Sequence, residues 1–341
     1  MRVLLLAGGT SSEREVSMTT GKAIHESLRR QGHEVLAIDP ASGRTLLDHD
    51  GKFLEDPEAG RSQAGSAVAV RPTALVTGLN REEYDNIDLV FLALHGGTGE
   101  NGSIQNLLEL SGKRFTGSSM VASAIAMNKA VSKRLFSSVG VATPEWELYS
   151  LKRDDSVEEL SEAIIEDFNF PVIVKPNASG STVGLTKVDG PEGLAGALKR
   201  AAAEGRDILV ERYIKGREIT VAVLDGHAFP VVEIIPKNEL YDYEAKYTKG
   251  KSEYVAPAII AESLSRQVRN AAVAVYQAIG ASGLARVDFV LAEPDTYYCL
   301  ELNTLPGMTG LSLAPMAAGC EGISFDELVT MIIKSALKRS H

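Results

Sequence analysis

The chain has 341 residues, of which 44% are hydrophobic and 23% charged, and these proportions are typical of a globular protein with two or three domains. Acidic residues exceed basic ones, 45 against 35, so the net charge of −10 argues against a nucleic-acid partner, which requires a basic surface. The two cysteines are too few for a disulfide framework or a zinc site. No segment is typical of a signal peptide or a membrane span, since the longest uncharged run, at residues 302–320, is broken by proline and glycine. We therefore expect a cytosolic enzyme.

The first third of the chain predicts a parallel sheet covered by helices. Apolar runs at residues 2–7, 34–39 and 88–94 alternate with helical patterns. Continuous apolar strands that alternate with helices are typical of parallel sheets buried on both faces. We expect an N-terminal α/β domain with a parallel sheet over residues 1–117.

The rest of the chain is richer in strands and predicts α+β structure in two further parts. Residues 118–210 contain a helical pair and then two strands, at 171–175 and 183–188, on either side of a glycine-rich loop. Residues 211–341 contain several strands, a long amphipathic helix, a hairpin and a final helix. We expect each part to form a separate unit.

Residues 97–102 match the G-x-G-x-x-G pattern of dinucleotide-binding folds, between a predicted strand and a predicted helix. Two features argue against nicotinamide or flavin binding. The strand is not the first of its domain, and no acidic residue ends a strand about 20 residues further on. We expect these glycines to shape a substrate loop instead.

The hairpin at residues 284–303 carries polar side chains that alternate along both strands. Arg286 and Asp288 share one face of the first strand, and Glu301 and Asn303 share one face of the second. Symmetric pairing about the expected turn sets Asp288 opposite Glu301 and Arg286 opposite Asn303.

The expected turn of this hairpin is the tetrad at residues 293–296, which sets Ala292 opposite Tyr297. Two directly opposed carboxylates, such as Asp288 and Glu301, lie about 5 Å apart at Cβ and repel each other. A divalent cation removes this repulsion, and Mg²⁺ that carries nucleotide phosphates is the natural ligand. The alternative is a solvated face on which both carboxylates point to water. We favour a metal site.

A lysine and a Gly/Ser-rich loop follow the predicted strand at residues 171–174. Lys175 ends this strand, and the loop runs over residues 176–184. Backbone N–H groups and hydroxyls of such a loop can bind phosphates while the lysine supplies charge. A simple turn is the alternative, but a phosphate loop beside a magnesium site favours phosphoryl transfer.

Seven segments in the same order resemble the ATP-grasp superfamily and, within it, the D-alanine–D-alanine ligases. They run through nearly the whole chain, at residues 8–17, 95–102, 127–129, 171–184, 211–214, 241–247 and, together, 286–288 with 301–309. The resemblance implies a Rossmann-like N-terminal substrate domain followed by a two-part ATP-grasp module, whose parts we place at 118–210 and 211–341.

The resemblance further implies ligation of two D-alanine molecules, driven by ATP, for peptidoglycan precursors. The carboxylate of the first D-alanine takes the γ-phosphoryl group, and the amine of the second then attacks the acyl phosphate and expels phosphate. Two Mg²⁺ ions would assist the reaction, and Mn²⁺ in their place is an open alternative. Such ligases are typically cytoplasmic homodimers, with neither a membrane nor a nucleic-acid partner.

The nucleotide site that the resemblance implies contains phosphate-binding lysines, lid residues, an adenine hinge and a ribose carboxylate. These residues are Lys129, Lys175 and Lys246; Ser181 and Thr182; Glu211, Arg212, Tyr213 and Ile214; and Glu218.

For the first D-alanine, the resemblance implies that Glu15 pairs with the ammonium group and that His95 lies nearby. Ser181 and Tyr247 would hydrogen-bond with Glu15 and hold residues 236–254 over the site as a lid. A closed lid would protect the acyl phosphate from water.

For the second D-alanine, the resemblance implies that Ser312 and Gly307 hold the carboxylate. Arg286 and the N–H of Gly307 would stabilise the tetrahedral oxyanion. Asp288, Glu301 and Asn303 would be the magnesium ligands, in agreement with the hairpin pattern.

The chain departs from the family pattern at two notable positions. Asn128 replaces a common Asp and is expected to cap the next helix equally well. Leu311 replaces a common His near the second-substrate pocket. The alternatives are a sister ligase that uses D-serine, D-lactate or another amino acid, and an ATP-binding module without turnover, although no expected catalytic residue is missing.

We predict that Asp288→Asn or Glu301→Gln abolishes turnover, because each change removes a charged magnesium ligand, and leaves the fold intact. Initial rates and circular dichroism of the two variants check this prediction. Undiminished activity in both would contradict the metal assignment.

Overall fold

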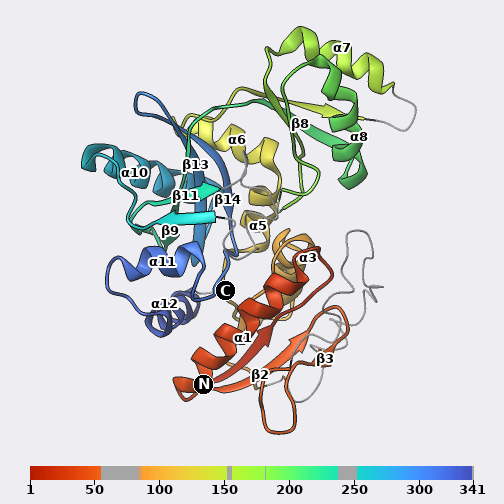
Figure 1. Cartoon of the computed structure of the whole chain (residues 1–341). Helices are drawn as coiled ribbons and strands as arrows, with labels where there is room; N and C mark the ends of the chain where they lie inside the picture. Colours follow the sequence, from red (N-terminus) through yellow and green to blue (C-terminus); the bar gives the residue numbers. More distant parts are fainter. Residues whose placement is uncertain (55–83, 85, 152–155, 181, 237–251, 340–341) are drawn as a thin grey trace.

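The computed structural model describes residues 1–54, 84, 86–151, 156–180, 182–236 and 252–339, which form three sheets with flanking helices (Figure 1). The confirmed class is mixed helix and sheet, with a parallel N-terminal part. No helix within the described residues is long and apolar enough to cross a membrane.

The N-terminal sheet has the strand order β3-β2-β1-β4, with β1 parallel to both β2 and β4, as predicted. Its strands are β1 (Arg2–Leu6), β2 (Glu34–Asp39), β3 (Arg44–Thr45) and β4 (Leu89–Leu92). Both faces are buried, because Val3 and Leu5 belong to one apolar cluster whereas Leu4 and Leu6 belong to another. Its helices are α1 (Arg14–Arg30), α3 (Gly97–Glu100) and α4 (Ser103–Leu110).

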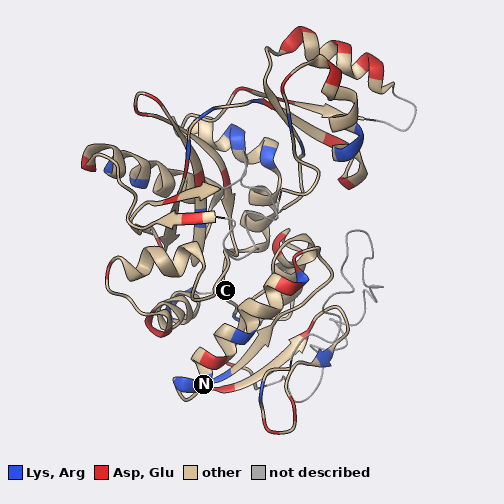
Figure 2. Ribbon diagram, in the orientation of Figure 1, with Lys and Arg blue, Asp and Glu red and all other residues tan. Residues whose placement is uncertain are grey.

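The central sheet is antiparallel, with the strand order β5-β8-β6-β7. Its strands are β5 (Trp146–Ser150), β6 (Val172–Pro176), β7 (Thr186–Val188) and β8 (Asp207–Arg212). The helices α7 (Val157–Asp167) and α8 (Leu194–Glu204), with the short helix η2 (Pro191–Gly193), complete this unit. The sequence predicted a boundary between residues 210 and 211, but strand β8 runs across it. Both partner strands of β8 lie in the central sheet, so the whole strand belongs to this unit. Acidic residues line the solvent side of α7 (Figure 2).

The C-terminal sheet has the order β12-β11-β9-β13-β14, with β10 added to β9. Its strands are β9 (Arg217–Leu224), β10 (His227–Ala228), β11 (Val232–Pro236), β12 (Ser252–Val255), β13 (Leu284–Ala292) and β14 (Thr296–Asn303). Helix α10 (Glu262–Ile279) packs in one apolar cluster with this sheet, and α11 (Leu313–Gly319) and α12 (Phe325–Lys338) pack in another. The second cluster also contains residues of α1 and β1, so α12 joins the N-terminal and C-terminal sheets.

Helices α5 (Met120–Met127) and α6 (Lys129–Ser138) pack on the C-terminal sheet, although the sequence grouped them with the central strands. Ala122, Ala126 and Phe136 lie in the same buried cluster as side chains of α10 and β14. The apolar side of this helix pair packs on the apolar surface of α10 and β14. Packing rather than chain order therefore determines which sheet the two helices join.

The hairpin β13–β14 matches the predicted register at one end and departs from it at the other. Asp288 faces Glu301, as predicted, whereas Ala292 faces Thr296 instead of Tyr297. The turn is therefore one residue shorter than expected, and a bulge after Asp288 takes up the difference on β14. A bulge places two successive residues of one strand opposite a single partner. This explains why the neighbours Leu300 and Glu301 both line one cavity.

Candidate active site

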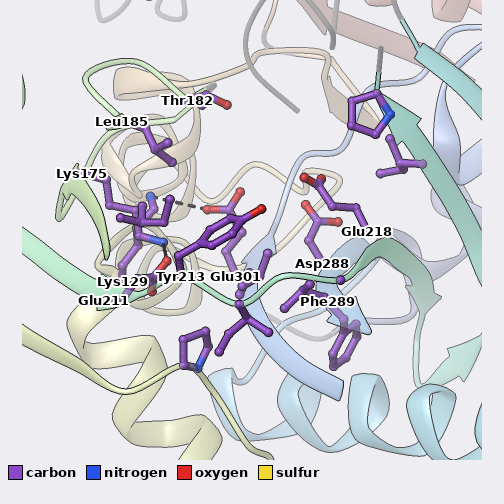
Figure 3. A pocket seen from close by; sticks show the side chains of 18 of the residues that line it. Lys129, Lys175, Thr182, Leu185, Glu211, Tyr213, Glu218, Asp288, Phe289 and Glu301 are labelled. Carbon is purple, nitrogen blue, oxygen red and sulfur yellow. Dashed lines mark hydrogen bonds and ion pairs between the residues drawn. The ribbon is translucent and has the colours of Figure 1, made fainter. Parts of the chain in front are cut away.

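A cavity of about 340 Å³ lies between the central and C-terminal sheets. Every residue predicted to bind the nucleotide lines it wherever the structure describes that residue, as do two of the predicted metal ligands (Figure 3). These residues are Lys129, Lys175, Thr182, Glu211, Arg212, Tyr213, Ile214, Glu218, Asp288 and Glu301. Ser181, Lys246 and Tyr247 lie outside the described residues, so their predicted roles stay predictions.

Lys175 and Glu211 form part of a buried charge cluster at one end of the cavity. The Lys175 ammonium donates to Glu211 Oε1 at 2.5 Å, and the ammonium of Lys133 forms an ion pair with Glu211 Oε2 at 2.7 Å. Burial alone would raise the pKa of the Glu211 carboxyl, but the two ammonium groups outweigh burial and lower it. The sequence reasoning missed Lys133, whose spacing of four residues from Lys129 on a helix was the available signal.

Lys129 extends from the start of α6 toward the carboxylates of the predicted metal site. Its ammonium donates to the carbonyl oxygen of Ser179 at 2.7 Å and lies 3.6 Å from Glu301 Oε2 (dashed in Figure 3). Just before it, the side chain of Asn128 caps α6 by accepting from the N–H of Val131, which confirms the capping expected for this departure. The helix start therefore holds Lys129 between the loop after β6 and the hairpin.

The hairpin face that carries Arg286 and Asp288 is already charge-balanced. Arg286 donates from Nε and Nη2 to the two Asp288 oxygens at 2.8 and 2.7 Å, and Thr220 donates to Asp288 Oδ1 at 2.6 Å. Asn303 Oδ1 accepts from the N–H of Leu305 at 2.9 Å. The guanidinium thus offsets the repulsion that we expected a metal alone to remove.

The oxygens of Asp288, Glu301 and Asn303 fit a hard divalent cation. Asp288 and Glu301 are directly opposed in the register, and Asn303 follows Glu301 on the same face of β14. Carboxylate and amide oxygens are the donors that Mg²⁺ and Ca²⁺ prefer. The donor set is therefore suitable for magnesium.

His95, in the loop after β4, lies in a second, buried polar cluster. Its Nδ1 is 2.9 Å from the carbonyl oxygen of Leu305, and its Nε2 is 3.0 Å from the hydroxyl of Thr20. A carbonyl oxygen only accepts, so Nδ1 carries the proton and Nε2 accepts from Thr20. Burial lowers the pKa of His95, and the ring is therefore neutral.

Glu100 belongs to the same cluster and was not singled out from the sequence. Its carboxylate accepts from the N–H of Gly96 at 2.9 Å. Burial first, and the nearby Glu13 carboxylate second, raise the pKa of Glu100 to about 7. No charge or spacing pattern distinguished it, because it lay inside the glycine motif at residues 97–102.

Glu13, rather than the predicted Glu15, faces this cluster. Glu15 is exposed on α1, whereas Glu13 is only 7% exposed. A methyl group added at Gly96 would collide with Glu13 Oε2, and one added at Gly180 would lie 3.0 Å from it. The carboxylate of Glu13 therefore lies between the loop after β4 and the Gly/Ser-rich loop after β6, which is predicted to bind phosphates. The structure places Glu13 rather than Glu15 at this cluster, because Glu15 is on the solvent side of the helix, and the role of Glu15 stays a prediction.

Gly307 and Ser312 lie side by side after β14, as their shared predicted role requires. A methyl group added at Gly307 would lie 3.0 Å from Ser312 Oγ. That hydroxyl oxygen accepts from the N–H of Thr309 at 3.0 Å, which fixes the turn. Leu311 is 72% exposed, so this departure points into solvent.

Two family models match the chain, described as D-ala D-ala ligase N-terminus, over residues 2–118, and D-ala D-ala ligase C-terminus, over residues 135–334. The chain is 41% identical to the D-alanine–D-alanine ligase of Geobacter sulfurreducens, over 98% of this chain and 94% of the relative. It is 39% identical to that of Syntrophotalea carbinolica, over 99% and 97%.

Solved structures are similar over nearly the whole chain. The D-alanine–D-alanine ligase of Bacillus anthracis complexed with ATP matches with a TM-score of 0.76 and 29% identity, over 99% of this chain and 98% of the other. The VanG D-Ala:D-Ser ligase of Enterococcus faecalis matches with a TM-score of 0.78 and 26% identity, over 98% and 99%.

We predict that Glu100→Gln stabilises the protein at high pH relative to the wild type. Because the folded-state pKa of about 7 exceeds the ordinary value of 4.5, stability from this group is present below pH 4.5 and is lost as the pH rises to 7. Glutamine mimics the protonated acid at every pH. The unfolding free energy of the variant minus that of the wild type should therefore increase by on the order of 1–3 kcal/mol between pH 5 and 8.

Urea unfolding at pH 5 and pH 8 measures this difference. Glu162→Gln, on the exposed face of α7, is the matched control and should give the same difference at both pH values. An equal difference for Glu100→Gln at both pH values would contradict the raised pKa.

Proposed function

The chain belongs to the D-alanine–D-alanine ligase family, and from this premise we propose that it joins two D-alanine molecules into D-alanyl-D-alanine with the conversion of ATP to ADP and phosphate. The observation that carries the proposal is one cavity that contains Lys129, Lys175, Asp288 and Glu301. This set unites cations for phosphates with oxygen donors for magnesium.

In the first step, the carboxylate of one D-alanine attacks the γ-phosphoryl group of ATP, and ADP leaves. Negative charge spreads over the phosphoryl oxygens during such a transfer, so fixed cations lower the barrier. Lys129 and Lys175 supply these cations from the cavity wall, and Tyr213 and Ile214 line the part assigned to adenine. Magnesium bound by the hairpin oxygens would neutralise further phosphate charge.

Glu13 receives the ammonium group of the first D-alanine in this proposal. Its buried carboxylate lies beside the loop that carries Gly180 and near the neutral His95. A carboxylate with little solvent contact makes a strong, charge-assisted hydrogen bond to an ammonium group. The substrate carboxylate can then extend toward the phosphate loop.

In the second step, the neutral amine of the other D-alanine attacks the acyl phosphate carbon, phosphate leaves with the bonding electron pair, and the proton lost from the amine passes to the leaving phosphate. The carbonyl oxygen gains negative charge, which Arg286 and the N–H of Gly307 stabilise. The ion pair with Asp288 aims the guanidinium along the hairpin face. Ser312, beside Gly307, holds the carboxylate of the second D-alanine.

We also propose the metal ions, the localisation, the oligomeric state and the second substrate that the sequence implied. The enzyme uses two Mg²⁺ ions, with Mn²⁺ as a substitute, and works as a cytoplasmic homodimer in peptidoglycan precursor synthesis. Ser181, Lys246 and Tyr247 bind the nucleotide or close over the substrates. D-Alanine is the second substrate, in preference to D-serine or D-lactate.

Phosphate release by the purified protein with MgATP, with and without D-alanine, tests the function directly. We expect release that depends on D-alanine, together with the mass of D-alanyl-D-alanine in the products. Adding D-serine or D-lactate beside D-alanine ranks the second substrates by the masses of the mixed products. ATP hydrolysis that ignores D-alanine, or no hydrolysis, would contradict the proposal.

We predict that Glu13→Gln lowers kcat/KM for D-alanine by about 10- to 100-fold, because it removes the charge from a hydrogen bond to an ammonium group. Glu15→Gln is the matched control, and its kcat/KM should stay within about threefold, as is usual for exposed positions. The KM for ATP should change little in both variants. A loss confined to Glu15→Gln would contradict the role proposed for Glu13 and support the role predicted for Glu15.

A further inference from the structure

Lys133 is a fully buried lysine that lies behind the cavity rather than in its wall. Its side chain is 0% exposed, whereas its partner Glu211 and the neighbouring Lys175 both line the cavity. Neither the proposed chemistry nor the proposed nucleotide contacts use Lys133. Buried lysines are rare unless they are paired, so its position requires an explanation.

The position of Lys133 is set by partners on the protein side. Its ammonium donates to the Thr143 hydroxyl at 2.6 Å, and that hydroxyl donates in turn to the carbonyl oxygen of Cys299 on β14 at 2.8 Å. The Thr143 oxygen can therefore accept from Lys133 while its own proton is committed. Helix α6 and strand β14 thus hold Lys133 in place.

Lys175 and Lys133 share one counter-charge. Glu211 offers Oε1 to Lys175 and Oε2 to Lys133, and its side chain is only 5% exposed. If Lys133 were uncharged, Lys175 would be the sole cation on a buried carboxylate. Moving Lys175 toward a phosphate would then leave that carboxylate unpaired, which is strongly unfavourable.

We propose that Lys133 is a positioning residue for the nucleotide: it keeps Glu211 neutralised, so that the Lys175 ammonium is available to the triphosphate. The inference deepens the proposed function and rests on it, since it takes Lys175 to be a ligand of the ATP phosphates. When ATP binds, Lys175 shifts its contact from Glu211 to a phosphate oxygen. The ion pair of Lys133 and Glu211 stays in place.

Binding of ATP and of adenosine, which has no phosphates, tests this inference in the full-length protein. We expect Lys133→Met to weaken MgATP binding by at least about tenfold, because Lys175 is then retained by a buried carboxylate that has lost its other partner. Adenosine affinity should stay within about threefold, because the base and ribose contacts do not involve Lys133. Calorimetry measures the first dissociation constant, and ligand-observed NMR the second.

A double variant distinguishes this role from a general packing role. The double variant Lys133→Met with Glu211→Gln replaces both the buried carboxylate and the lysine that stays paired with it by neutral side chains. No buried carboxylate then retains Lys175. MgATP affinity of the double variant should lie within about threefold of that of Glu211→Gln alone, because without the carboxylate Lys133 has no charge to offset. Lys334→Met, which removes an exposed lysine of α12, is the charge-matched control and should bind both ligands as the wild type does.

Three results would overturn the inference. In the first, Lys133→Met binds MgATP as tightly as the wild type. In the second, Lys133→Met loses ATP and adenosine affinity equally. In the third, the double variant binds MgATP much more weakly than Glu211→Gln alone. The last result decides the matter even if the single variant does not fold. A wild type that binds no MgATP would instead refute the proposed function and, with it, the inference.

Discussion

The register of the hairpin β13–β14 is the constraint on which the site depends. It sets Asp288 against Glu301 and Arg286 against Asn303, so all four polar side chains emerge on one face. A shift by one residue would turn one strand's set to the opposite face. The bulge after Asp288 allows a shorter turn without that shift, and it brings Leu300 to the cavity beside Glu301.

Charge compensation links this face to the other parts of the site. Arg286 offsets Asp288, Lys129 approaches Glu301, and Lys133 with Lys175 offsets Glu211. Buried or half-buried charges are tolerated only when they are paired, so each carboxylate requires its cation nearby. The same cations are the groups that an incoming triphosphate needs. The same side chains thus stabilise the ligand-free protein and bind the nucleotide. On binding, a cation exchanges a carboxylate for a phosphate, and no charge is left unpaired.

Local periodicity was sufficient to predict the parallel N-terminal sheet and the facing pair Asp288 and Glu301, because strand alternation and pairing are short-range rules. The register near the turn was predicted wrongly, since a bulge leaves no reliable trace in one sequence. Lys133 and Glu100 owe their roles to burial, which depends on packing between segments distant in the chain. Glu13 and Glu15 are two residues apart, and only the start of α1 decides which one faces the cluster.

The most direct measurement is anomalous scattering from Mn²⁺ in crystals grown with a non-hydrolysable ATP analogue. We expect a peak within about 2–2.5 Å of carboxylate oxygens of both Asp288 and Glu301, the range for hard cations on oxygen. The triphosphate should lie on the same side of the cavity, with Lys129 and Lys175 against it. A manganese peak elsewhere, with no metal on the hairpin, would contradict the site described here.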